Sequence, residues 1–267
     1  MNLLNYRSNL YTSIGNDGII EKIFDITGLK KGRFLEFGAW DGIHGCNSRK
    51  LAMEGWGGAF IEPVFYRYLK LLWNYRKYKN IKKINSFVDL KGNKTLDNLL
   101  SNEDQFDFIS IDIDGLDFSV FETINSFSPM LYCIEGGQML VPFHPKVSTN
   151  IEKYNVQQSL SVIKQIADNK GYKIICSYQD TFLIRKDFAH LFPVSEDINE
   201  LYFNGLIASY NRLPWIKEIL KKLNITNEIV NNILDKTNYS KYGYKNRKKW
   251  AKENKKIIIE TIENVRK

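Results

Sequence analysis

Residues 34–48 read FLEFGAWDGIHGCNS. The apolar run at the start of this stretch predicts a buried strand, and Gly38 and Gly42 end the strand in a turn. Glycine allows the backbone of such a turn to come close to a ligand. The turn is not G-x-G-x-x-G, and Glu36 and Asp41 place negative charge beside it, which disfavours a pyrophosphate. The stretch therefore favours a ligand that has a cationic end.

Short apolar runs alternate with helical patterns along most of the chain. This alternation is typical of βαβ units and predicts an α/β fold, in which helices cover both faces of a mostly parallel sheet. The predicted strands are 33–37, 59–63, 81–88, 106–113, 130–135, 172–178 and 180–187, and the clearest helices are 66–78 and 156–171.

The 267 residues are 43% hydrophobic and 13% aromatic, which is enough for a substantial core. We expect one sheet domain at 1–190, with a boundary near Pro193 and a helical, basic extension at 191–267. The net charge of +8 lies mostly in 241–267, where ten Lys and Arg face three Glu, a local charge of +7. This charge describes a tail and says little about the main site.

Targeting and redox signals are few. No apolar run approaches the roughly 18 residues that a transmembrane helix requires, and the N-terminus lacks the pattern of a signal peptide. The three cysteines lie far apart without CxxC spacing, which disfavours a zinc or redox site. We expect a cytoplasmic protein without a transmembrane segment.

Acidic residues follow the ends of successive predicted strands. In open parallel sheets, ligands bind beyond the carboxyl ends of the strands. Glu62 ends the second strand 24 residues after Gly38, near the roughly 20 residues expected for the acid that binds ribose hydroxyls. A carboxylate can accept hydrogen bonds from both hydroxyls. A ribose, no phosphate and a cationic end together predict S-adenosylmethionine.

The fourth strand reads FDFISIDIDGLD, over 106–117. Asp112 is expected at its end, beside the methyl group, and Asp114 two residues further on the same side. Two neighbouring carboxylates can hold a divalent cation, or one of them can act as a base. The alternative is a purely local role, in which Asp114 and Gly115 form a turn and Asp117 caps the next helix.

Two further candidates follow the fifth strand. Glu135 ends that strand on the ligand side, and His144 lies in the loop GGQMLVPFHP that follows. A histidine above the sheet is a candidate general base or metal ligand, although an isolated surface histidine is common.

The chain resembles the FkbM-type branch of class I S-adenosylmethionine-dependent methyltransferases. The similarity begins at SIGNDGII, from residue 13, and continues through FLEFGAWDGIHGCNS, FIEP, FISIDIDGLD and CIE. It ends in SLSVIKQIADNKGYKIICSYQDTFLIRKD. It covers about residues 10–190 and implies a Rossmann-like, seven-stranded sheet whose last strand is antiparallel.

The resemblance also implies roles for individual residues. It places Glu36, Gly38 and Asp41 at the methionine end of the cofactor, Glu62 at the ribose, Ser86 and Phe87 at the adenine, and Asp112 near the sulfonium. The expected cofactor site is completed by Ala39, Asn47 and Pro63. Because some related sugar O-methyltransferases hold a metal with acids at this position, Mg²⁺ is a candidate at Asp112, Asp114 and Glu135. The catalytic candidates are Asp114 and His144.

Two departures from the family pattern limit what the resemblance implies. Ile14 and Asn16 replace residues that are usually Gln and Glu, so the lid over the cofactor is expected to differ. The residues after Glu135 match no pattern of the family, so the acceptor site does not follow from analogy.

The predicted function is metal-assisted O-methylation of a sugar, a glycan precursor or another small hydroxylated metabolite. A nucleic-acid methyltransferase is the alternative, because the tail KYGYKNRKKWAKENKK mixes basic and aromatic residues. Against it, DIDG stands where amino-methylating DNA enzymes usually carry an Asn/Asp-Pro-Pro-aromatic motif. A non-catalytic module and an NAD-dependent oxidoreductase are less favoured. The tail could also mediate homo-oligomer contacts.

Overall fold

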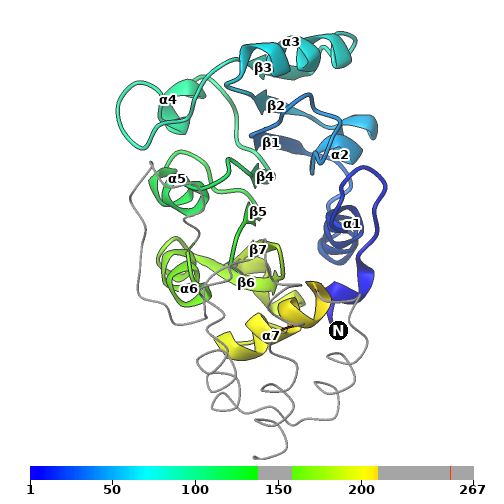
Figure 1. Ribbon diagram of the computed structural model, residues 1–267, viewed down its shortest axis with the longest axis vertical. Helices are drawn as coiled ribbons and strands as arrows, with labels where there is room; N and C mark the ends of the chain where they lie inside the picture. The colour runs from blue at the N-terminus through cyan, green and yellow to red at the C-terminus, as the bar shows by residue number, and fades with distance from the viewer. Residues whose placement is uncertain (138–157, 210–252, 254–267) are drawn as a thin grey trace, which may run out of the picture.

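The computed structural model describes residues 1–137, 158–209 and 253. Its centre is a seven-stranded sheet in the order β3-β2-β1-β4-β5-β7-β6 (Figure 1). Strands β1 to β5 are parallel, and β7 runs antiparallel to both β5 and β6. The strands are β1 Arg33–Phe37, β2 Gly57–Ile61, β3 Ile81–Ile84, β4 Phe108–Ile111, β5 Leu131–Glu135, β6 Tyr172–Ser177 and β7 Asp180–Arg185. The mostly parallel α/β sheet is confirmed, and so is the antiparallel last strand.

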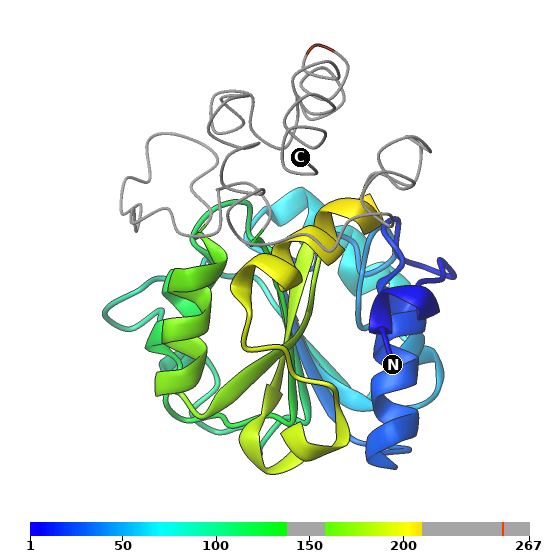
Figure 2. The ribbon, with the colours of Figure 1, turned by 90° about the horizontal axis from the view of Figure 1, so that it is seen from below.

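Helices cover both faces of the sheet, and Figure 2 shows α1 and α6 on opposite sides of it. The described helices are α1 Asn16–Thr27, α2 Arg49–Met53, α3 Phe65–Asn74, α4 Leu96–Leu99, α5 Asp117–Thr123, α6 Leu160–Asn169 and α7 Ile198–Ser209, with short 3-10 turns η1 Leu3–Tyr6 and η2 Lys186–Leu191. Among these, none is both long and apolar enough to cross a bilayer.

The core consists of two apolar layers, because side chains along a strand alternate between the faces of the sheet. In β1, Leu35 and Phe37 join the layer that contains residues of α4, α5, α6 and α7. Phe34 points the other way, into the layer with residues of α1, α2 and α3. Glu36 shares that second face and is also buried, so its carboxylate needs polar partners within the fold.

Several predicted strands extend beyond the observed ones at their carboxyl ends. The strand predicted at 81–88 ends at Ile84, and the one predicted at 106–113 ends at Ile111. After β3, Asn85 donates from its side-chain amide to the backbone oxygens of Glu62 and Pro63. The extra apolar residues therefore belong to loops above the sheet, which an apolar pattern alone does not separate from a strand.

The described start of the predicted extension packs on the sheet domain. Ile198, Leu201 and Tyr202 of α7 are buried in the layer with α6. Residues 138–157, 210–252 and 254–267 lie outside the described residues, and they include His144 and most of the basic tail.

Candidate active site

A cavity of about 1050 Å³ opens at the carboxyl ends of the parallel strands. It lies where the strand order reverses, since β1 has β2 on one side and β4 on the other, and this is the expected place for a ligand. Ten of the predicted site residues line it: Glu36, Gly38, Ala39, Glu62, Pro63, Ser86, Phe87, Asp112, Asp114 and Glu135.

The turn after β1 passes very close to the neighbouring backbone. Gly38 and Ala39 donate from their backbone N–H groups to the carbonyl oxygen of Ile61, at 3.1 and 3.2 Å. Gly38 has φ +80°, and a Cβ at this position would overlap the carbonyl oxygen of Asp112. The position therefore requires glycine both for its left-handed conformation and for the close approach.

This geometry predicts that Gly38→Ala destabilises the fold by about 3 kcal/mol or more, because overpacking adds to backbone strain. Gly45→Ala is the matched control, since Gly45 also has a positive φ, +67°, but nothing lies within 4 Å of the Cβ it would carry. The control should cost only about 1–2 kcal/mol. Urea unfolding measures the free energy of unfolding of both variants. Equal losses of stability would show that the close approach of Gly38 to Asp112 adds nothing to the cost of backbone strain.

Glu36 fixes the loop that leads into α2. Its Oε1 accepts from the backbone N–H of Asn47 at 3.0 Å, and its Oε2 accepts from that of Ser48 at 2.7 Å. The Cys46 thiol also donates to Oε2, at 3.2 Å. Burial raises the pKa of Glu36, and these hydrogen bonds offset part of that increase. The Glu36 carboxylate therefore binds the backbone N–H groups of this loop and also lines the cavity.

Asp41 and Asn47 are buried but are not among the residues that line the cavity. Asp41 Oδ1 accepts from the backbone N–H groups of Ile43 and His44, at 2.9 and 3.0 Å, and its Oδ2 lies 2.7 Å from the His44 ring. Burial raises the pKa of Asp41, but these hydrogen bonds outweigh it and lower the pKa. Asn47 donates to Ser110 Oγ at 3.0 Å.

Glu62 is held in place by two backbone groups. Its Oε2 accepts from the N–H of Trp40 and its Oε1 from the N–H of Val64, both at 2.8 Å. Trp40 has φ +51°, so the turn is strained to present this N–H. An ionised carboxylate has about four acceptor positions, so about two remain for a ligand in the cavity.

One wall of the cavity is formed by residues 10–13, which we call the N-terminal strap. Only Ser13 of this strap belongs to the motif from which a lid over the cofactor was expected, and the other three residues were not predicted. Asp17 holds the strap, because its Oδ2 accepts from the backbone N–H groups of Leu10, Tyr11 and Thr12 at 2.9, 2.8 and 2.7 Å. Arg49 also lines the cavity, with its guanidinium 4.6 Å from the centre of the Tyr11 ring. These residues come from outside the strand ends, where the pattern of acids gave no signal.

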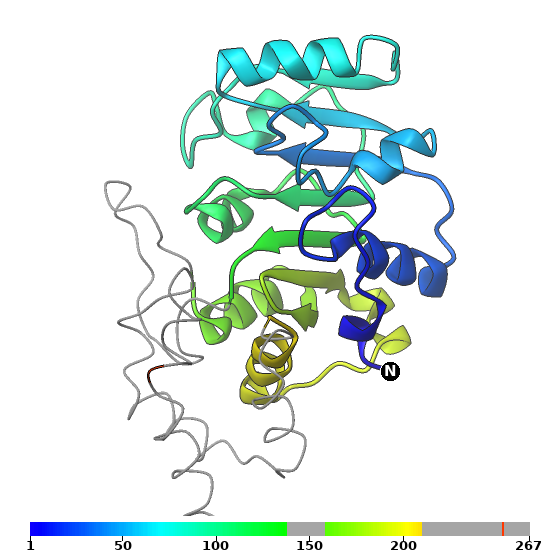
Figure 3. The same cartoon turned by 45° about the vertical axis from the view of Figure 1, so that its right-hand side comes forward.

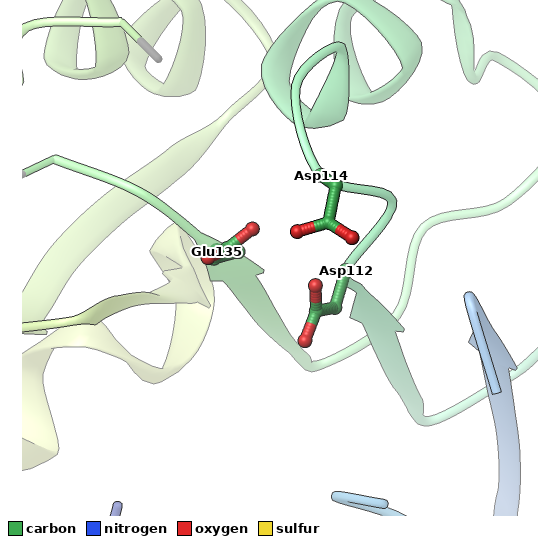
Figure 4. Close-up of side chains that lie close together, drawn as sticks. All are labelled: Asp112, Asp114 and Glu135. Atoms are coloured by element: carbon green, nitrogen blue, oxygen red, sulfur yellow. The ribbon is translucent and has the colours of Figure 1, made fainter. Parts of the chain in front are cut away.

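Asp112, Asp114 and Glu135 form a cluster of carboxylates, and Figure 4 shows them pointing toward one another from the ends of β4 and β5. One oxygen from each lies within 4.8 Å of the others. This spacing suits a divalent cation bound by hard oxygen ligands.

The turn between β4 and α5 creates this cluster. Asp114 adopts φ +60°, so its carboxylate returns toward Asp112 through a bend and not through strand alternation. Asp117 holds the bend, since its oxygens accept from the N–H groups of Ile113 at 2.7 Å and Gly115 at 2.9 Å. The local turn that was the alternative to a functional role is therefore present, and it is what brings the acids together.

The negative charges of the three carboxylates repel one another. Asp112 is exposed to solvent in the open cavity, but the protein packed around it raises the pKa of its carboxyl, and the negative charge of Glu135 raises it further. Burial also raises the pKa of Glu135, as do Asp117 and Asp180. Without a cation nearby, the pair tends to retain a proton near neutral pH, and a bound cation would displace it.

The raised pKa values predict lower stability at higher pH. Burial raises the pKa of Asp117 to about 6, above the roughly 3.9 of an unfolded aspartate. The folded state therefore holds a proton that the unfolded state releases, and stability falls as pH rises through this window. From pH 5 to 8 with chelator present, we expect a loss of about 1 kcal/mol from Asp117 alone. Urea unfolding at both pH values measures this loss of stability. The loss should be smaller in the Asp117→Asn variant. A gain in stability from pH 5 to pH 8 would contradict the prediction.

No protein-family model and no curated protein matches this chain. Solved structures with a similar fold include S-adenosylmethionine-dependent methyltransferases. One from Clostridium acetobutylicum is 10% identical over 64% of this chain and 90% of its own, with a TM-score of 0.39. The N-terminal domain of EvdMO1, with S-adenosylhomocysteine bound, is 12% identical over 65% and 82%, at 0.42. The methyltransferase domain of bacterial CtHen1 is 12% identical over 65% and 99%, at 0.43. Similarity at this level identifies neither a reaction nor a substrate.

Proposed function

We propose that this protein is an S-adenosylmethionine-dependent methyltransferase. The observation that carries the proposal is that carboxylates already occupy the backbone amides around the turn after β1. Asp41 accepts from the N–H groups of residues 43 and 44, and Glu36 accepts from those of residues 47 and 48. A dinucleotide needs such amides free for its pyrophosphate. This arrangement supports an adenosyl ligand without phosphate.

The other walls suit the parts of that ligand. Glu62 would accept from the ribose hydroxyls, and Ser86 and Phe87 would contact the adenine. Glu36, Gly38, Ala39 and Pro63 would form the adjoining wall, while Asp41 and Asn47 would support the loop from behind. Asp112 would attract the sulfonium, and Arg49 would bind the carboxylate of the methionine end, since a guanidinium matches a carboxylate.

The proposed reaction is O-methylation. The acceptor oxygen forms a bond to the methyl carbon while the carbon–sulfur bond breaks, which leaves S-adenosylhomocysteine, and the hydroxyl proton passes to a base. Asp114 is the described candidate base, and His144 is the candidate outside the described residues. Asp112, Asp114 and Glu135 fit Mg²⁺ through their three convergent oxygens, and such an ion would lower the pKa of the acceptor hydroxyl.

The finer assignments belong to the same proposal. We infer a sugar, glycan precursor or similar hydroxylated metabolite as acceptor, membership of the FkbM-type branch, and a cytoplasmic location. The resemblance of FLEFGAWDG and IDIDGLD to that branch supports them.

Isothermal titration of S-adenosylhomocysteine and NAD⁺ into separate samples tests the proposal. S-adenosylhomocysteine should bind and NAD⁺ should give no binding heat. Binding of NAD⁺ alone would favour an oxidoreductase and contradict the argument from occupied amides. Failure of both ligands to bind would remove the basis for a nucleoside site.

A further inference from the structure

Helix α3 exposes an unusual set of large side chains. Phe65, Tyr66, Leu69 and Trp73 are 63%, 65%, 47% and 67% exposed, and we call them the α3 outer face. The opposite side of the helix supplies Leu71 to the core. The helix is therefore apolar on both sides, although only one side is buried by the described fold. Exposed apolar groups gathered in this way mark interaction sites.

The same segment is strongly basic. Residues 64–83 contain seven Lys and Arg and no Asp or Glu. Two cations stand directly beside the exposed rings, with Lys70 Nζ 4.6 Å from the centre of the Tyr66 ring and the Arg76 guanidinium 4.0 Å from that of Trp73. Lys77 is also exposed. The α3 outer face thus combines apolar surface with positive charge and suits an anionic partner.

The position of α3 indicates which shape of partner surface can contact this helix. Figure 1 and Figure 3 both show α3 at one end of the molecule, next to β3, with no other described element on its far side. The high exposure of its four side chains is that of a projecting helix side. A broad, flat surface can meet it without a conformational change, whereas single-stranded nucleic acid is usually held in a groove.

We propose that the α3 outer face docks on the surface of an anionic lipid bilayer. Aromatic side chains favour the level of the lipid headgroups, and Lys and Arg beside them attract anionic phosphates. A second copy of this chain fits less well, because a two-fold contact would bring the basic segments of both copies together. Arg67 of the same helix lines the cavity and stacks on Trp40 at 4.1 Å, so the docking face and the candidate active site share one helix.

Vesicle co-sedimentation of the full chain tests the proposal. The wild type should bind vesicles that contain phosphatidylglycerol and should not bind pure phosphatidylcholine. The triple variant F65S/L69S/W73S keeps every charge, including those of the C-terminal tail, and should bind at least about tenfold more weakly, because it removes the apolar contact. The charge variant K70E/K77E should also weaken binding. Y6S/L191S, at residues that are 41% and 38% exposed elsewhere, is the matched control and should bind like the wild type.

Three results would overturn the proposal. Equal binding by the wild type and F65S/L69S/W73S would place the lipid contact on another surface, such as the tail. Failure to bind vesicles, together with binding of a single-stranded oligonucleotide that the triple variant loses, would identify a nucleic-acid site. A wild-type dimer that the triple variant converts to a monomer would identify a contact between copies. Circular dichroism shows that each variant is folded. If the wild type does not bind S-adenosylhomocysteine, that result contradicts the proposed function and leaves the docking proposal unaffected.

Discussion

Glu62→Gln is expected to weaken the binding of S-adenosylhomocysteine about 100-fold, which corresponds to about 3 kcal/mol. The substitution removes the charge that strengthens hydrogen bonds from both ribose hydroxyls. It also disturbs the support of the side chain, since both backbone partners of Glu62, the N–H groups of Trp40 and Val64, are donors. One of them would face the amide NH₂ of glutamine and lose its acceptor.

Isothermal titration calorimetry measures this effect, and Asp107→Asn is the matched control. Asp107 also accepts a backbone hydrogen bond, from the N–H of Arg33 at 2.8 Å, but it directly precedes β4, beside the start of β1, and does not line the cavity. The control should bind S-adenosylhomocysteine like the wild type. Unchanged affinity in folded Glu62→Gln would mean that this carboxylate does not contact the ribose.

The double variant Asp112→Asn/Glu135→Gln is expected to bind Mn²⁺ at least about 100-fold more weakly than the wild type. It replaces two of the three clustered carboxylates by neutral amides, and the affinity of a site for a divalent cation depends on the charge of its ligands. In the wild type, Mn²⁺ affinity should increase from pH 6 to pH 8, because the proton retained by the raised pKa values of Asp112 and Glu135 must leave before the ion binds.

Electron paramagnetic resonance of free Mn²⁺ follows the titration without knowledge of the acceptor. Asp89→Asn is the control, since Asp89 lines the same cavity but does not belong to the cluster, and it should leave Mn²⁺ affinity unchanged. No Mn²⁺ binding by the wild type, or full methyl transfer after stringent chelation once an acceptor is known, would contradict the metal site. His144 would then be the favoured base.

Much of the fold could be predicted from the sequence because buried parallel strands and amphipathic helices leave periodic patterns. The meeting of Glu62 and Asp112 in one cavity followed from their positions at strand ends. The orientation of Asp41 could not be predicted, since a carboxylate in a turn can serve a ligand or its own backbone equally well. Only the positions of the N–H groups of Ile43 and His44 decide between these roles.

The position of the N-terminal strap could not be predicted for a related reason. Asp17 stands in the first turn of α1, which begins at Asn16 with Gly15 as its cap. The Asp17 carboxylate binds the strap amides. Local patterns show that an acid stands near a helix start, but they do not show which distant amides it will bind.

The place of β7 between β5 and β6 has a consequence for how the chain is made. A ribosome releases residues in order, and β5, at 131–135, has only one neighbour in the sheet until β7, at 180–185, has emerged. During that interval the open edge of β5 offers unpaired backbone groups and the apolar side chains of Tyr132 and Ile134 to other chains. Slow translation or a truncated mRNA would prolong that interval. Chains that end before residue 185 should therefore be the ones most prone to aggregate.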